Sequence, residues 1–151
     1  MHLHENLGLA ISIAQKIDEI VNPKRNIVID DSISEMGRNP GNLQMEIIAD
    51  YMNEHWGKDY DLPYLYDVLE KWIVPIKNKF PWGFSIPYAL SGKYKIHRTY
   101  AEFLKNKSGI SSRDIDVIFK NFDRSEVELY NEKYLNKVYK KYILKKARKN
   151  E

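Results

Sequence analysis

A β-branched run, Ile27-Val28-Ile29, most constrains the fold, because it follows a stretch with helical spacing and precedes another. The run ends in Asp30-Asp31, a pattern typical of a buried strand with polar residues at its carboxyl end. The preceding stretch, Asn6 to Val21, has apolar residues at three- and four-residue intervals and predicts a largely buried helix. Helix followed by strand is half of an α/β unit, and such a strand needs covered faces and neighbours on both sides.

Two histidines, His2 and His4, stand before that helix and are separated by one residue. Side chains at positions i and i+2 of a strand point the same way, so the pair is compatible with a strand that ends in a metal site. The alternative is a poorly ordered terminus without a ligand role. Spacing alone favours this alternative.

A loop over residues 32–42 follows the predicted strand and is rich in glycine and asparagine. Its Arg38 and Gly41 suit close approach of the backbone to an anionic ligand, whereas the simpler interpretation is a connecting loop. Asn42 is well placed as the N-cap of a helix over Leu43 to Trp56. This capping role does not exclude a ligand role for Asn42.

The amino-acid composition excludes several classes of protein. The 151 residues are 43% hydrophobic and contain no cysteine, so the chain is globular and has neither a disulfide nor a thiolate metal site. No apolar run approaches the roughly 20 residues of a membrane span, and the start lacks the plan of a signal peptide. We therefore expect a soluble, cytoplasmic protein without a membrane partner.

The second half of the chain has helical spacing throughout. It predicts helices over 63–77, 86–90, 99–105 and 112–121, and Ser111 with Asp114 resembles a capping arrangement at the start of the helix over 112–121. A last helix is expected to begin with a capping box at Ser125 and Glu128. Residues 124–151 hold 9 basic and 4 acidic side chains, a charge of +5, with tyrosines among the lysines. Such a pattern can bind single-stranded nucleic acid, but packed tyrosines with solvated lysines are favoured. We do not expect nucleic acid as a partner.

Three ordered segments of the first half together resemble a known enzyme class. They are His2-Leu3-His4-Glu5-Asn6-Leu7-Gly8-Leu9-Ala10, the run Ile27 to Asp31, and Met36-Gly37-Arg38-Asn39-Pro40-Gly41-Asn42-Leu43. They resemble the end of the barrel in the HMG-CoA lyase-like aldolases (DRE-TIM metallolyases), and a looser likeness to 4-hydroxy-2-oxovalerate aldolase-like proteins continues through Pro81 to Tyr88. The resemblance implies an α/β fragment that is mostly α. Residues 1–58 would be the last one or two strands and helices of a TIM (β/α)8 barrel, and residues 59–151 a helical C-terminal extension.

The resemblance also implies a site. His2, His4 and Asn42 match ligands of a divalent metal, Mn²⁺ or Mg²⁺, and Asp30, Arg38 and Gly41 are candidates for the substrate loop. In the family the ion is a Lewis acid for a 2-oxo acid, in retro-aldol release of pyruvate or a related acyl condensation.

The family's metal aspartate, arginine and base come from earlier strands. We therefore expect a C-terminal fragment that holds no assignable catalytic residue and is inactive alone. The alternative is a helical interaction or dimerisation module without catalysis, which contacts a second copy or a partner enzyme.

Overall fold

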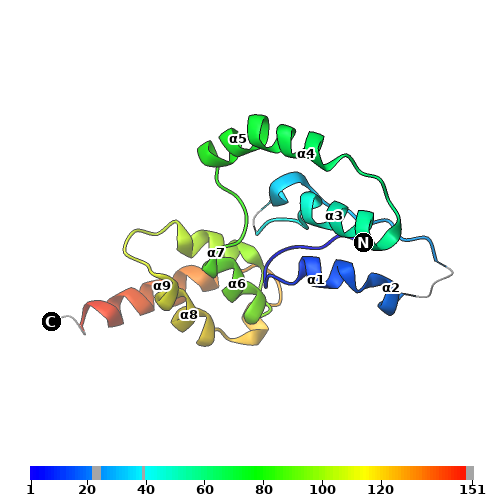
Figure 1. Cartoon of the computed structure of the whole chain (residues 1–151). Coiled ribbons are helices and arrows are strands. Elements are labelled where there is room, and N and C mark those ends of the chain that lie inside the picture. Colours follow the sequence, from blue (N-terminus) through cyan, green and yellow to red (C-terminus); the bar gives the residue numbers. More distant parts are fainter. Residues whose placement is uncertain (22–24, 39, 149–151) are drawn as a thin grey trace. The chain divides into compact units, whose positions relative to one another are not determined.

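The structure is a computed structural model that describes residues 1–21, 25–38 and 40–148 (Figure 1). The chain divides into two compact units, Met1–Ser85 and Ile86–Glu151, called unit 1 and unit 2. The division after residue 58 rests on a resemblance rather than on compactness, and it stays a prediction. None of the helices in the described ranges combines the length and the apolar character that a bilayer crossing requires.

Unit 1 consists of short helices joined by extended connections. In order they are α1 (Ala10–Gln15), α2 (Ile17–Ile20), the 3-10 turn η1 (Ile33–Glu35), α3 (Met45–Trp56), α4 (Leu62–Val68), the π-helical turn η2 (Leu69–Ile73) and α5 (Val74–Lys79). A small buried cluster joins α1 to α3, which lie side by side (Figure 1), and its members are Ala10, Ala14, Leu43 and Ile48. The helix predicted over Asn6 to Val21 is interrupted at Lys16, and Leu7 and Leu9 remain exposed.

The prediction of an α/β fragment with the last strands of a TIM barrel was wrong. Within residues 1–21, 25–38 and 40–148 the fold is all-helical, and β-pairing is limited to isolated bridges between His2 and Asp30, His4 and Asn42, and Ser32 and Gln44. The expected strand is left uncovered, with Val28 73% exposed. A β-branched run forms a ladder only where neighbouring segments take up its backbone N–H and C=O groups along its length. In the described part of this fold the neighbouring segments form bridges only at single residues, so no ladder forms along the run.

Unit 2 contains α6 (Ile86–Lys93), α7 (Arg98–Lys105), α8 (Ser112–Lys120), the 3-10 turn η3 (Arg124–Glu126) and α9 (Glu132–Ala147). These helices enclose one hydrophobic core, whose buried residues are Tyr88, Tyr100, Ala101, Leu104, Ile115, Ile118, Phe119, Val127 and Leu135. The Tyr100 hydroxyl donates to the Leu129 carbonyl at 3.0 Å and accepts from the Asn131 amide at 2.8 Å. The hydroxyl of this buried tyrosine is therefore satisfied.

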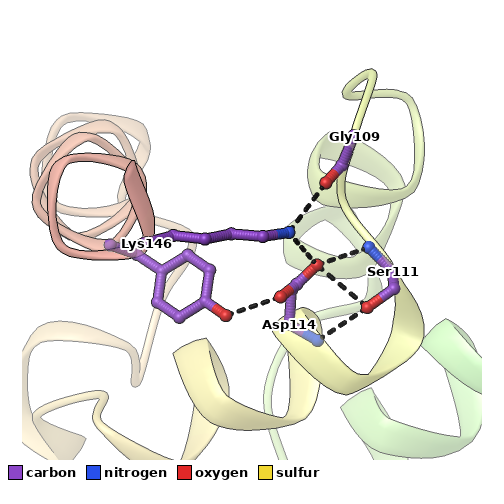
Figure 2. Close-up of polar contacts among 5 residues, drawn as sticks. Gly109, Ser111, Asp114 and Lys146 are labelled. Carbon is purple, nitrogen blue, oxygen red and sulfur yellow. Dashed lines mark hydrogen bonds and ion pairs between the residues drawn. The ribbon is translucent and has the colours of Figure 1, made fainter. Parts of the chain in front are cut away.

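A set of polar contacts holds α9 against the start of α8. We call it the polar clasp and define it by Ser111, Asp114, Tyr142 and Lys146. Ser111 and Asp114 form the predicted capping box, and Lys146 Nζ donates to Asp114 Oδ2 at 2.8 Å and to the Gly109 carbonyl at 3.0 Å (Figure 2). The Tyr142 hydroxyl donates to Asp114 Oδ1 at 2.6 Å. The carboxylate thus joins two helices.

Ionisation of Asp114 follows from these contacts. Burial opposes the charged form, but hydrogen bonds from Lys146, Tyr142 and Ser111 outweigh it and lower the pKa of Asp114 below its usual range. Burial and the hydrogen bond to Asp114 raise the pKa of Tyr142 to about 12. By contrast, the capping box predicted at Ser125 was wrong, because α9 begins at Glu132.

Candidate functional site

Three segments of unit 1 converge where the histidines lie. Backbone hydrogen bonds join Glu5 N to Gly41 O at 3.1 Å, Leu43 N to Leu3 O at 3.2 Å, and Ser32 N to Leu43 O at 3.0 Å. These bonds and the isolated bridges bring His2 beside Asp30 and His4 beside Asn42. The structure therefore brings together the residues that the sequence places 28 and 38 positions apart.

The two imidazole rings pack edge to face, with their centroids 4.7 Å apart. His4 Nδ1 lies 3.2 Å from the Gly41 carbonyl oxygen. Because a carbonyl only accepts, His4 Nδ1 carries the proton in this bond and Nε2 is the nitrogen with a lone pair. His2 Nδ1 lies 3.8 Å from Asp30 Oδ2. The 3.8 Å separation is too long for a hydrogen bond, so only His4 has its Nδ1 held by an oxygen, the arrangement that orients histidine ligands in metal sites.

Asn42 occupies the loop between these bridges and α3. Its side-chain amide donates to the Met36 carbonyl at 3.1 Å, whereas its buried Oδ1 has no hydrogen-bond partner among the described residues. The sequence predicted Asn42 as the N-cap of α3, and this prediction was wrong. Gln44 is the residue that precedes the helix, and it makes no side-chain cap. A buried amide oxygen without a partner is costly and marks a position where a ligand would be favourable.

The substrate-loop candidates differ in accessibility. Arg38 and Asp30 are exposed, and Gly41 is buried with φ of +99°. At Gly41 an added Cβ would lie 2.5 Å from Glu35 Oε2. Gly41 therefore allows close backbone approach to a carboxylate of the chain itself, and its role beside a substrate stays a prediction.

That carboxylate belongs to a cluster that the sequence analysis missed. Glu35 is only 8% exposed, and its Oε1 pairs with Lys77 Nζ at 3.0 Å. Lys77 also donates to the Ser34 carbonyl at 3.3 Å, and Trp82 Nε1 donates to the same carbonyl at 2.9 Å. Ser34 and Glu35 both have positive φ, 50° and 54°. Non-glycine residues rarely adopt this conformation, so the contacts from Lys77 and Trp82 hold a strained turn in place.

Glu5 is a second buried acid at this place. It is 8% exposed, and burial raises its pKa, with a further contribution from the negative charge of Glu35. Backbone contacts from Ile11 and Ala10 act in the opposite direction. Asp31 behaves similarly, because burial and then Asp30 raise its pKa. Carboxyl groups with raised pKa values at a site are candidates for proton exchange.

Glu5 lies in one of the segments that resemble the enzyme class but was given no role, and no signal in the sequence identified Glu35 or Lys77 as part of a site. Glu35 and Lys77 are 42 residues apart, and neither lies in a recognisable motif. The histidine pair and Asn42 were found because a motif joins them. The assignment of metal ligands stays a prediction, and the described residues contain no group of three or more histidine, cysteine, aspartate or glutamate side chains placed to hold a metal.

Comparison with solved structures finds one informative neighbour. The chain is similar to a structure described as "Crystal structure of the N-terminal domain of a putative aldolase from Bacteroides vulgatus", with 32% sequence identity and a TM-score of 0.58. The match covers 72% of this chain but 35% of the other, so this chain spans about a third of that protein domain's length. No protein-family model matches the sequence, and no curated protein matches it. The neighbour supports a likeness to aldolases and leaves the HMG-CoA lyase-like family a prediction.

Proposed function

We propose that this chain is part of an aldolase that breaks or forms a carbon–carbon bond in a 2-oxo acid, as in retro-aldol release of pyruvate. The aldolase would belong to the HMG-CoA lyase-like enzymes and would be most similar to 4-hydroxy-2-oxovalerate aldolase. The observation that carries the proposal is that the His2 and His4 rings pack against each other while a bridge joins His4 to Asn42. The chain is also 32% identical, over 72% of its length, to a structure described as the N-terminal domain of a putative aldolase. Fold likeness alone would not support an activity.

The donor set fits a divalent cation such as Mn²⁺ or Mg²⁺. Two imidazoles with oxygen ligands suit Mn²⁺ better than Mg²⁺, which prefers oxygen ligands alone, and Asn42 Oδ1 has no partner within the described part of the chain. When bound, the ion supplies Lewis-acid polarisation of the substrate's carbonyl group. The Gly41 carbonyl would keep His4 in the tautomer whose Nε2 faces the ligand. Substrate and water oxygens, or groups from elsewhere, would take the remaining positions.

Other side chains would bind the substrate's carboxylate and hold a proton near the ligands. The exposed guanidinium of Arg38 suits a bidentate contact with a substrate carboxylate. Glu5, with its raised pKa, would hold or accept a proton near His4. Lys77 and Trp82 would keep the loop before Asn42 in position through Ser34.

Metal binding tests the ligand assignment without requiring turnover. We expect Mn²⁺ to bind the purified chain in a titration followed by electron paramagnetic resonance, and the His2→Ala/His4→Ala variant to lose that binding. The chain has 4 histidines, so His55→Ala/His97→Ala is a matched control that removes the other two and should bind as the parent does. Equal loss in both double variants, or no binding by the parent at millimolar Mn²⁺, would contradict the assignment.

Activity is a separate measurement. With Mn²⁺ and 4-hydroxy-2-oxo acids, pyruvate release would be followed by coupling to lactate dehydrogenase. We expect no turnover from these 151 residues alone, because the neighbour described as an aldolase has much further sequence outside the match. Turnover by the isolated chain would show that its own residues complete the site.

A second candidate function is that of a helical interaction or dimerisation module. The stretch α4–η2–α5 has no buried residue within unit 1, and Trp72 and Phe84 are 58% and 53% exposed. Tyr88 is buried in the core of unit 2 and is unavailable to such a surface. Size-exclusion chromatography with light scattering tests this function: Trp72→Ser should weaken a dimer, whereas Leu129→Ser, at an exposed site in unit 2, should not. A monodisperse monomer at all concentrations would argue against homodimerisation.

A further inference from the structure

A basic groove lies within unit 2, between α8 and α9. It has a volume of about 760 Å³, within the range of small-molecule sites. One wall carries Arg113 from α8, and the other carries Lys137, Lys141 and Lys145 from α9. These four residues are called the groove cations.

The three lysines form a stripe along α9. They are spaced by four residues, so they lie on one side of the helix and rise by about 6 Å from one to the next. Arg113 belongs to the neighbouring helix and lines the same groove. The cations therefore converge on one space from two elements, which charge on a single solvated helix face would not do.

The acidic side chains around the groove interact with residues other than the groove cations. Asp114 is held by Lys146 and Tyr142 in the polar clasp (Figure 2). Asp116 accepts from Lys93 Nζ and from the Tyr94 hydroxyl, each at 2.9 Å. Among residues 1–21, 25–38 and 40–148, no carboxylate forms an ion pair with a groove cation. Four positive charges thus share a hollow without a counter-ion from the described chain.

The remaining lining limits the kind of anion. Val117, Ile118 and Val138 supply apolar surface. The Tyr134 hydroxyl accepts from the Asp123 amide at 2.7 Å, and the Tyr142 hydroxyl donates to Asp114. Both tyrosine rings are therefore fixed in the wall. Sequence-tolerant binding of single strands uses a series of rings on which successive bases stack, whereas the aromatic residues that line this groove are these two tyrosines.

We propose that the α8–α9 groove binds a small ligand that carries several phosphate groups, with the groove cations as its phosphate contacts. Guanidinium forks and lysine ammonium groups are the usual protein partners of phosphate. The apolar surface suits a non-polar part attached to the phosphates, as in a nucleoside triphosphate. This binding site lies outside the residues proposed for aldolase chemistry and does not depend on that function.

Titration calorimetry of the full chain at low ionic strength tests the proposal. The probes are inorganic tripolyphosphate, ATP without added metal, and a 20-nucleotide oligouridylate. We expect saturable 1:1 binding of tripolyphosphate and ATP, which compete with each other and weaken as salt is added. Tighter binding of ATP would show that the apolar surface contributes. Oligouridylate binding that tripolyphosphate cannot displace would overturn the proposal.

Two double variants that remove the same charge distinguish binding in the groove from non-specific electrostatic attraction to the basic helix. Lys137→Gln/Lys141→Gln removes two groove cations, whereas Lys133→Gln/Lys140→Gln removes two exposed lysines of the same helix that do not line the groove. We expect the first variant to raise the Kd about tenfold or more and the second to raise it less than about threefold. Circular dichroism melting checks that both are folded. Equal weakening in both, or no saturable binding by the parent at millimolar tripolyphosphate, would overturn the proposal.

Discussion

Each unit has a buried acid paired with a lysine, Glu35 with Lys77 and Asp114 with Lys146, but among the described residues only unit 1 also has carboxyl groups whose pKa is raised by burial. In unit 2, Asp114 is surrounded by donors, and its pKa is lowered. In unit 1, burial raises the pKa of Glu5 and of Asp31. The buried side-chain oxygens without a partner in the described chain, those of Ser32, Asn42 and Ser85, also lie in unit 1. Incompletely satisfied polar groups are typical of functional sites, whereas satisfied ones are typical of a scaffold.

Packing shows the same contrast. Unit 2 surrounds its core with aromatic contacts, such as Tyr100 against Phe122 and Phe119 against Phe122, whose ring centroids are 5.3 Å apart in both cases. Unit 2 also exposes a few large apolar side chains, such as Leu129, but unit 1 exposes more of them, including Val28 and Trp72. We infer that unit 2 is the more cohesive unit and that unit 1 carries the candidate site.

Cavity-forming substitutions should give the largest difference between the units. Leu135 in unit 2 and Leu43 in unit 1 both have 0% exposure. We expect Leu135→Ala to reduce the free energy of unfolding by about 3 kcal/mol, and Leu43→Ala by less, because loosely packed surroundings can collapse into the cavity. Urea denaturation with hydrogen exchange on the intact chain assigns each loss to its unit. A larger loss from Leu43→Ala would reverse the ranking of the two units.

The polar clasp should give the next largest effect. Asp114→Asn removes a buried charge from Lys146 and Tyr142, and we expect it to reduce the free energy of unfolding by about 2 kcal/mol at pH 7. Asp116→Asn, on the same helix but at the surface, is the control and should cost much less.

The effect of Asp114 should depend on pH. Its folded pKa lies below the ordinary aspartate value of 3.8, so its stabilisation is complete above about pH 5 and is lost as pH falls through the folded pKa. The difference between parent and Asp114→Asn should therefore shrink in acid, as measured by urea denaturation at several pH values. A difference that stays constant down to pH 2 would contradict this ionisation.

The glycines packed against Glu35 offer a test of unit 1. At Gly83, φ is +107° and an added Cβ would collide with the Glu35 carboxylate, whereas Gly57, with φ of +61°, has open space around the same position. We expect Gly57→Ala to cost about 1 kcal/mol from backbone strain alone. Gly83→Ala should cost roughly 1 kcal/mol more, and Glu35→Ala in the same chain should relieve that excess. Equal thermal stability of the two single variants would show that the carboxylate moves aside freely.

The smallest effect should come from Glu5. Its folded pKa is raised above 4.5, so its ionisation opposes folding above that pKa, and the opposition is relieved as pH falls toward 4.5. Glu5→Gln should therefore increase the free energy of unfolding at pH 7 by less than about 1 kcal/mol. Hydrogen exchange of unit 1 amides at pH 5 and pH 7 would measure this change. A loss of stability at pH 7 would mean that the carboxylate is needed as an ion.

Local patterns in the sequence were the reliable ones. The capping box at Ser111 and Asp114 and the helices near 99–105 and 112–121 were predicted, because their contacts lie within a few residues. The strand at Ile27–Ile29 was predicted wrongly, because a ladder depends on segments remote in sequence. For the candidate site, a motif suggested His2, His4 and Asn42, whose ligand role stays a prediction, while the contact between Glu35 and Lys77 emerged only from the fold.

The sequence by itself therefore determined where most helices form and which residues resemble the ligands of a metal site. Periodicity, caps and motifs depend on neighbours along the chain. Tertiary structure decided that Ile27–Ile29 remains without a ladder, that Glu5 and Glu35 are buried acids, and that Arg113 meets the α9 lysines across a groove. Burial and charge environment are set by side chains that are distant in sequence. Their effects on the pKa values of acids and on ligand binding appear only when those side chains are brought together.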